Sequence, residues 1–300
     1  MKKLFILLTL GCAAAFSSCL KNDRYESDQN APGYDMYVVV MRQNIVALDP
    51  FNAAFRLNML IAEGGGDYKA APPEIMNTLF SAGTRIEYDD PTGVYTIEYN
   101  GSPTTKDNVR NGKIRIRTNG YATLDEAQAR WTIDLAQTDS YSIFDPEEIK
   151  ISADSYTIEN MGTNKWQAVM KSFRAKFAAA ENGSDWTAVY DIEQKEGGRL
   201  YKEVIKSNFL IGTTANKSTT MDAPTESSRL YASTPDIPFM FNPSCSRRLP
   251  VAQGEMNIYL AADTELESFT TALIVPNDPS VCYPVTRITY QGYTKEYEIK

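Results

Sequence analysis

The feature that most constrains this 300-residue chain is an alternation of apolar and polar side chains that starts at Thr84 and recurs toward the end. Ile86 and Tyr88 alternate with charged residues, and the turn residues 91–93 follow them. Further alternating runs lie at Tyr95/Ile97/Tyr99, Ile114/Ile116, Trp131/Ile133/Leu135, Ile149/Ile151 and Tyr156/Ile158. A period of two places alternate side chains on opposite faces of a strand. We therefore expect a mainly β fold, an antiparallel hairpin meander arranged as an open sheet or a sandwich.

Asn-Gly dipeptides punctuate this pattern. Both residues tolerate the positive φ angles that type I′ turns require, so each dipeptide is a candidate hairpin apex. The four are Asn100-Gly101, Asn111-Gly112, Asn119-Gly120 and Asn182-Gly183.

A short helical segment is expected before the strands. Asp49-Pro50 has the composition of a helix start, and Gly64-Gly65-Gly66 that of a helix stop, which predicts a helix over Pro50–Glu63. Pro73–Phe80 is a second short candidate. Met36–Ala47 stays open between helix and strand, because its three consecutive valines favour a strand.

One segment, Lys165–Ala180, fits both periods. Trp166, Val169, Met170, Phe173 and Phe177 have helical spacing, whereas Phe173, Ala175 and Phe177 alternate. The Asn182-Gly183 turn signal that follows favours a hairpin.

The chain divides by composition. Residues 215–234 are rich in Ser, Thr and Asn and contain Pro224, which predicts a long loop or linker. The expected parts are a signal peptide (1–18), a flexible tether (19–34), an N-terminal helical segment (35–83), a β-meander (84–214), a loop or linker (215–235) and C-terminal β-hairpins (236–300).

The N-terminus has the pattern of an export signal. Lys2 and Lys3 precede an apolar stretch, Leu4–Phe16, that is too short to span a bilayer, and small residues lead to Cys19. This pattern predicts cleavage before Cys19, acylation of its thiol and anchoring to an envelope membrane, with the surface and periplasmic faces of the outer membrane both open. The alternatives are cleavage before Cys12 and an ordinary secretory signal in which Cys19 is incidental.

Composition excludes several chemistries. The chain has no histidine, which rules out His-dependent catalysis and His-containing zinc sites. Its net charge is −8, and without Lys2 and Lys3 the remainder is near −10, so nucleic acid is a poor partner. No motif indicates a catalytic residue, a metal ligand or a cofactor.

If Cys19 is acylated, Cys245 and Cys282 remain as a pair for an oxidising compartment. A disulfide between them would stabilise the fold by about 3–4 kcal/mol in the chain-entropy model. It is favoured because both residues flank strands expected to be neighbours, and the alternative is two buried free thiols.

Aromatic residues are the remaining functional indication. Trp131, Trp166 and Trp186, with nearby tyrosines, are candidates for a platform that stacks sugars. Their spacing in period with Ile and Val favours the core of the sheet instead. Carboxylate pairs such as Asp89-Asp90 and Glu147-Glu148 are better explained as turn residues and strand neighbours.

The C-terminal run, with Cys245, Pro250, Gly254, Cys282 and the closing hairpin Thr286–Ile299, resembles a group of uncharacterised Bacteroidetes lipoproteins. Gly112–Ile116 and the Asn182-Gly183 hairpin with Trp186 also look similar, whereas the long stretch 215–234 departs from the group. The resemblance covers most of Thr84–Lys300 and implies export, a β-rich body and no known activity.

These observations favour a non-catalytic binding or scaffold lipoprotein of the cell envelope, with a glycan or an envelope protein as partner. A hydrolase that uses paired carboxylates, in particular a glycoside hydrolase, and a purely structural envelope component are the alternatives.

Overall fold

The computed structural model describes most of the chain after residue 31. The described residues are 32–101, 110–135, 141–144, 148–177, 184–195, 197–204, 209–220, 229–233, 239–241, 251–262, 265–274, 285–290 and 293–298. Residues 40–300 form one compact unit, and the preceding residues belong to another.

The helices are α3 (Pro32–Glu63), the short 3₁₀ helix η2 (Tyr68–Ala70), α4 (Pro73–Phe80) and α5 (Tyr201–Val204). The strands are β1 (Arg85–Asp89), β2 (Val94–Asn100), β3 (Arg110–Arg117), β4 (Arg130–Asp134), β5 (Tyr141–Phe144), β6 (Glu148–Ser152), β7 (Ser155–Gly162), β8 (Lys165–Phe177), β9 (Ser184–Gln194), β10 (Phe209–Thr220), β11 (Arg229–Ser233), β12 (Phe239–Phe241), β13 (Val251–Ala262), β14 (Glu265–Ile274), β15 (Val285–Tyr290) and β16 (Tyr293–Glu298).

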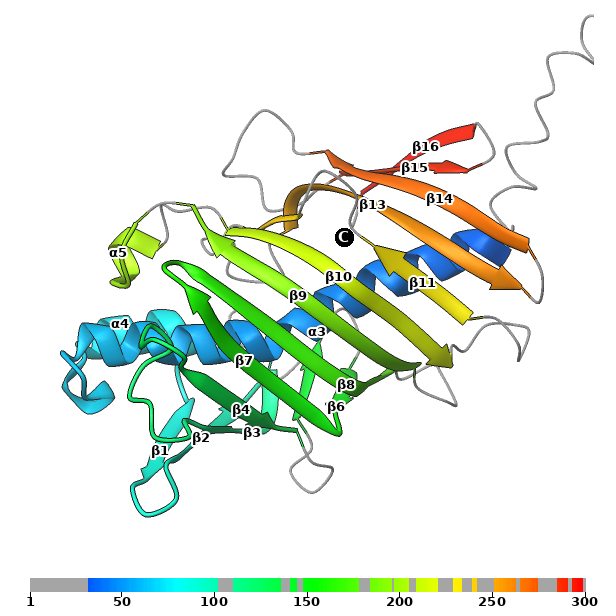
Figure 1. The fold of residues 1–300 in the computed structure, drawn as a ribbon. Coiled ribbons are helices and arrows are strands. Elements are labelled where there is room, and N and C mark those ends of the chain that lie inside the picture. The colour runs from blue at the N-terminus through cyan, green and yellow to red at the C-terminus, as the bar shows by residue number, and fades with distance from the viewer. Residues whose placement is uncertain are drawn as a thin grey trace, which may run out of the picture. The chain divides into compact units, whose positions relative to one another are not determined.

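The described strands form one antiparallel sheet that follows the chain as a meander (Figure 1). Its main path runs β1-β2-β3-β4-β7-β8-β9-β10-β11-β13-β14-β15-β16. Neighbours along the path are mostly neighbours in sequence, as expected for strands joined by hairpins. The predicted mainly β, antiparallel fold is confirmed.

Strands β5 and β6 close part of this sheet into a circuit of pairings. β3 pairs with β4 along Arg115–Arg117 and with β5 at Arg110 and Asn111. β8 likewise pairs with β7 in its first part and with β6 in its second. The pairings β3-β4-β7-β8-β6-β5-β3 therefore return to their starting strand, which an open sheet does not do.

Helix α3 is longer than the predicted Pro50–Glu63, because it begins at Pro32 and continues through Pro50. The segment Met36–Ala47, left open above, is therefore helical. Pro50 has no N–H to donate to the carbonyl of Val46, so the ladder is interrupted in this turn. In the same turn the Tyr156 hydroxyl donates to the carbonyl of Ala47 (2.9 Å), which anchors the interrupted turn to β7.

The C-terminus of α3 is a Schellman motif built on glycines. Gly65 has φ +65°, Gly66 donates to the Ile61 carbonyl (2.9 Å), and Gly65 donates to the Ala62 carbonyl (3.0 Å). A Cβ on Gly64 would lie 1.9 Å from the backbone oxygen of Asp67. The predicted helix stop is confirmed, and so is the second helix over Pro73–Phe80.

Residues 46–61 of α3 are buried on almost every side, which is unusual for a surface helix. Phe55 contacts the rings of Trp166 on β8 and Phe209 on β10, with centroid distances of 5.2 and 5.1 Å. The opposite contacts come from β3 and β5, which reach Asp49. In Figure 1 this part of the helix runs across the direction of the strands.

The Asn-Gly prediction has mixed outcomes. Asn119 and Gly120 both have positive φ angles, 55° and 90°, and form a turn closed by Tyr121 and Thr118. Asn100 is the last residue of β2 and pairs with Asn111 of β3, and because residues 102–109 lie outside the described part of the chain, the predicted apex at Asn100-Gly101 is not tested. Asn111-Gly112 is not an apex: it lies inside β3, opposite Asn100 and Tyr99, because the pairing with β2 extends past it. Asn182-Gly183 lies outside the described residues.

The contested segment is strand β8, paired with β9, so the predicted hairpin is confirmed there. Its helix-like spacing has a structural cause. A bulge separates Met170 from Phe173, and Ser172 has φ 46°. The extra residue reverses which side chains face the core, so that even-numbered residues are buried before the bulge and odd-numbered ones after it.

The stretch predicted as a loop or linker, 215–235, is largely strand. β10 continues to Thr220 and pairs with β9, and β11 occupies Arg229–Ser233. Ser, Thr and Asn are therefore ladder residues here, because pairing on both sides of β10 satisfies its backbone.

Several predicted features lie outside the described residues. They are the signal peptide with Cys12, the acylation site Cys19 and the cysteine pair Cys245 and Cys282. Among the helices that are described, none is both long and apolar enough to cross a bilayer.

Candidate functional site

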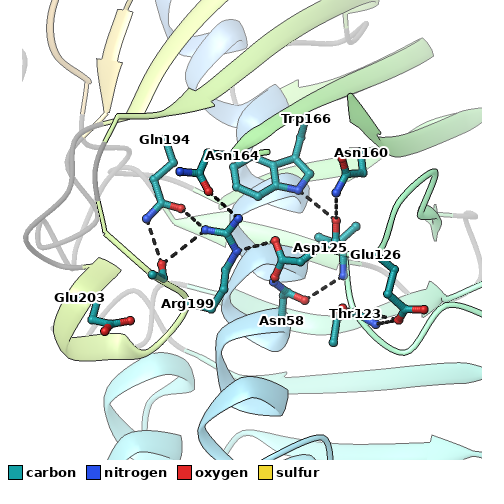
Figure 2. Close-up of polar contacts among 12 residues, drawn as sticks. Asn58, Thr123, Asp125, Glu126, Asn160, Asn164, Trp166, Gln194, Arg199 and Glu203 are labelled. Carbon is teal, nitrogen blue, oxygen red and sulfur yellow. Dashed lines mark hydrogen bonds and ion pairs between the residues drawn. The ribbon is translucent and has the colours of Figure 1, made fainter. Parts of the chain in front are cut away.

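The structure gathers polar side chains in two places. The first, here called the Arg199 cluster, consists of Asn58, Asp125, Asn164, Gln194 and Arg199 (Figure 2). The Arg199 guanidinium donates to the Asp125 carboxylate, to Gln194 Oε1 (2.6 Å) and to Asn164 Oδ1 (2.8 Å). It also lies 4.9 Å from the centroid of the Trp166 ring, within cation–π distance.

The loop between β3 and β4 is held against α3 by the same cluster. Asn58 is fully buried; its amide donates to Asp125 (2.9 Å), and its carbonyl oxygen accepts from the backbone N–H of Leu124 (2.9 Å). The Leu124 carbonyl accepts from Asn160 (2.9 Å) and from Trp166 Nε1 (3.2 Å), as Figure 2 shows. The loop therefore has specific partners on the helix, β7 and β8.

This arrangement is suited to holding segments together rather than to acid–base chemistry. Both Asp125 oxygens are engaged, one by Arg199 and one by Asn58. A carboxylate held in this way has no free oxygen directed at a substrate. The Arg199 cluster therefore fixes the 118–129 loop and the 197–204 segment against α3.

The second group, here called the Asp49 cluster, consists of Asp49, Arg56, Tyr99, Arg110 and Tyr141. Arg110 donates two hydrogen bonds to Asp49 Oδ1, from Nε (3.0 Å) and from Nη2 (2.5 Å). The Tyr141 hydroxyl donates to Asp49 Oδ2. The Asp49 side chain is 3% exposed and that of Arg110 is 13% exposed. Asp49 was expected to cap a helix, but the helix continues past it and its carboxylate forms an ion pair with β3.

Burial shifts the pKa values in this cluster. It raises the pKa of Tyr99 to about 12 and raises the pKa of Tyr141 well above its ordinary value of 10. Burial, with repulsion from Arg110, lowers the pKa of Arg56 to about 10. Burial by itself lowers the pKa of Arg110, but the Asp49 carboxylate together with Tyr141 and Tyr99 raises it by more, so the net shift of that pKa is upward. The tyrosines are thus neutral hydrogen-bond donors at neutral pH.

The fold is expected to lose stability between pH about 10 and about 12. Tyr95 and Tyr99 have folded pKa values of about 12, and those of Tyr141 and Tyr156 are also raised, against about 10 in an unfolded chain. Their contribution is complete below pH 10 and is lost as the pH rises through the folded values. Arg56 opposes this loss of stability, because its pKa in the folded state is lowered to about 10. The four tyrosines together are expected to outweigh this one arginine.

Urea unfolding at pH 9, 10, 11 and 12, followed by tryptophan fluorescence, measures this loss. Tyr99→Phe should reduce the slope of unfolding free energy against pH, because it removes one of the titrating groups. A free energy of unfolding that stays constant over this pH range would contradict the prediction.

The predicted carboxylate pairs do not converge on a site. Asp89 ends β1, where its side chain accepts from Thr92 and its carbonyl accepts from Gly93 (2.9 Å), as expected of a turn residue. Glu148 on β6 accepts from Ser142 (2.9 Å), and Glu147 lies outside the described residues. No group of three or more Cys, Asp or Glu able to hold a metal occurs within the described part of the chain.

The tryptophans predicted as a stacking platform are core residues. Trp131 and Trp166 are 0% and 1% exposed, so neither presents a ring face to solvent. The core interpretation is confirmed for these two, and also for Tyr95, Tyr99, Tyr156 and Tyr190. The physical reason is their alternation with Ile and Val on the face that packs against α3. The side chain of Trp186 lies outside the described residues.

Sequence reasoning missed both clusters. Their members are far apart along the chain: Arg110 and Asp49 are 61 residues apart, and Arg199 and Asp125 are 74 apart. One signal was available. The stretch 45–62 of α3 is apolar except for four polar residues and Pro50, and a polar group on a buried face requires partners elsewhere. The four are Asp49, Asn52, Arg56 and Asn58.

Comparison with protein-family models, curated proteins and solved structures gives no match. The fold and the two clusters define the chain as a mainly β protein whose antiparallel sheet packs against a buried helix. The buried polar residues of that helix are joined to the sheet and its loops by ion pairs and hydrogen bonds.

Proposed function

We propose that this chain is an exported lipoprotein, anchored through an acylated Cys19, whose β-rich body is a non-catalytic binding or scaffold module of the cell envelope. The observation that supports a non-catalytic body is that the carboxylates in the two clusters already have hydrogen-bond partners. Asp49 is held by Arg110 and Tyr141, and Asp125 by Arg199 and Asn58. The polar groups that the fold brings together thus support its rigidity.

The anchor is supported by the sequence around Cys19. A short basic start, an apolar stretch of signal-peptide length and small residues before the cysteine are the elements that such processing needs. A diacylglycerol thioether with an additional N-acyl chain exceeds the two-chain requirement for stable membrane attachment. Residues 20–31, which lie between Cys19 and the start of α3, would then tether the lipid to the body, so the expected tether is shorter than 19–34.

Membrane retention tests the anchor. Cys19→Ala is expected to abolish incorporation of a clickable fatty acid and to move the protein from the membrane to the soluble fraction. Cys12→Ala is the matched control, because Cys12 is the competing cleavage site, and it should leave both readouts unchanged. Normal labelling and retention of Cys19→Ala would contradict the proposal.

The partner is proposed to be a glycan or another envelope protein, consistent with the acidic body and the absence of a basic track. A glycan panel incubated with the full-length protein distinguishes binding from turnover. Saturable binding with an unchanged glycan supports a binding module. Release of reducing ends would contradict the non-catalytic half of the proposal and favour a carboxylate-dependent glycoside hydrolase.

A further inference from the structure

Beyond the proposed function, we propose that the outer edge of β1 is a self-association surface, at which β1 of a second copy of this chain pairs in antiparallel orientation. In the single chain the Tyr68 hydroxyl occupies part of this edge and competes with the second copy. The inference does not depend on the lipid anchor. It rests on the backbone groups of one strand, on the contacts of Tyr68 and on the charges that the pairing brings together.

Strand β1 is an end strand of the sheet. It is the first strand along the path of pairings, and among the described strands only β2 pairs with it. In a strand, the N–H and C=O groups of alternate residues point to opposite sides. The backbone groups of β1 that point away from β2 therefore form an edge that can serve as a template for another strand.

The contacts of Tyr68, in the 3₁₀ helix η2, show which groups these are. Its hydroxyl donates to the backbone carbonyl of Ile86 (3.4 Å). Burial raises the pKa of Tyr68, and a hydrogen bond from the backbone N–H of Tyr88 partly offsets that rise. Because Tyr68 is not part of the sheet, the backbone groups of Ile86 and Tyr88 are those of the outer edge. The hydroxyl thus stands in for part of a neighbouring strand, through a bond to Ile86 that is long and therefore weak.

A second copy of β1 satisfies the outer backbone groups in one register. In a two-fold antiparallel pair centred on Glu87, Ile86 of each copy lies opposite Tyr88 of the other. Each such pair exchanges both of its N–H···O=C bonds, so the outward groups of Ile86 and Tyr88 all gain partners. Their side chains then lie opposite each other on one face of the ladder, where the exposed Tyr88 ring gains an apolar neighbour.

Charge complementarity on the other face favours the same register. Arg85 and Asp89 are exposed residues at the two ends of β1, and centring the pair on Glu87 places each Arg85 opposite Asp89 of the other copy. Glu87 lies opposite its own counterpart, but Arg85 Nη2 is 2.5 Å from Glu87 Oε1 and reduces that repulsion. Because the strand is short and keeps this like-charge contact, we expect weak, reversible association.

Disulfide cross-linking of the full-length protein in detergent tests the pairing. In this register the two copies of residue 87 form a non-hydrogen-bonded pair, with Cα atoms about 4.5 Å apart, which is within disulfide reach. Under copper phenanthroline, Glu87→Cys is therefore expected to give a disulfide-linked homodimer. Glu98→Cys is the matched control, at a half-exposed glutamate of β2, a strand that pairs on both sides. It should give no more dimer than the wild type, which carries the same native cysteines.

Tyr68→Phe, added to Glu87→Cys, tests the competition at the edge. It removes the hydroxyl but keeps the ring, which packs against Tyr95 with centroids 5.5 Å apart. The initial rate of dimer formation is expected to rise about tenfold, the effect of one to two hydrogen bonds that no longer have to be displaced. An unchanged rate would overturn the role of Tyr68.

A charge exchange in the Glu87→Cys background tests the register. Asp89→Arg should slow cross-linking, because it places two arginines opposite each other, and the double variant Arg85→Asp, Asp89→Arg should restore the rate. Equal rates for these two variants would overturn the proposed register. Equal dimer yields for Glu87→Cys and Glu98→Cys, or a disulfide formed only with a different protein, would overturn self-association through β1.

Discussion

Replacing Arg110 with methionine is expected to lower the free energy of unfolding by about 3–5 kcal/mol, the usual cost of leaving one partner of a buried ion pair uncompensated. Arg110 donates two hydrogen bonds to Oδ1 of Asp49, whose side chain is 3% exposed. Without Arg110 only the Tyr141 hydroxyl would still contact this carboxylate among the partners described above. Urea unfolding at pH 7, followed by tryptophan fluorescence, measures the loss.

The double variant Asp49→Asn, Arg110→Met is the control for this prediction. It removes both charges while Tyr141 can still donate to the amide oxygen at position 49, so more than half of the lost stability should return. If the single variant lies within about 1 kcal/mol of the wild type, the pair contributes no more than an exposed ion pair would. That result would contradict the buried geometry of the Asp49 cluster.

Replacing Phe55 with alanine should be about as damaging, at about 3–5 kcal/mol, the range observed when a buried phenylalanine is truncated. Phe55 is 4% exposed and contacts Phe51, Trp166 and Phe209, with ring centroids 5.1 to 5.7 Å away. The substitution removes the aromatic contact that joins α3 to both β8 and β10. The same urea unfolding measurement applies.

Two further variants calibrate the Phe55 result. Phe55→Leu keeps most of the apolar volume and should cost clearly less than Phe55→Ala. Met161→Ala, at a residue that is 55% exposed near the end of β7, should change the free energy of unfolding by no more than about 0.5 kcal/mol. Equal effects of Phe55→Ala and Met161→Ala would contradict the packing of α3 against the sheet.

The local content of the sequence predicts most of the strands. Alternation along Tyr95, Ile97 and Tyr99 identified β2, and the buried residues of that strand are these three. The positive φ of Asn119 and Gly120 followed from residue type alone. Such features depend only on residues close by in the sequence. They follow from the steric preferences of each residue and from which face of a strand is apolar.

Two local signals gave the wrong structure because more distant contacts outweighed them. A helix N-cap contributes about 1 kcal/mol, whereas breaking a buried ion pair costs about 3–5 kcal/mol, so pairing with Arg110 takes precedence over capping at Asp49. Asn111-Gly112 has turn composition, but the register of β2 and β3 continues through it. In each case the decisive partner lies elsewhere in the sequence.

The sequence by itself determined the β class of this protein, the end of α3 at its three glycines and the core character of Trp131 and Trp166. Only the tertiary structure decided that α3 passes through Pro50, that β8 carries a bulge and that Asp49, Arg56 and Tyr99 lie together. The reason is physical. Steric and apolar periodicity act over a few residues, whereas a buried charge or hydroxyl is satisfied by whichever partner the folded chain brings to it.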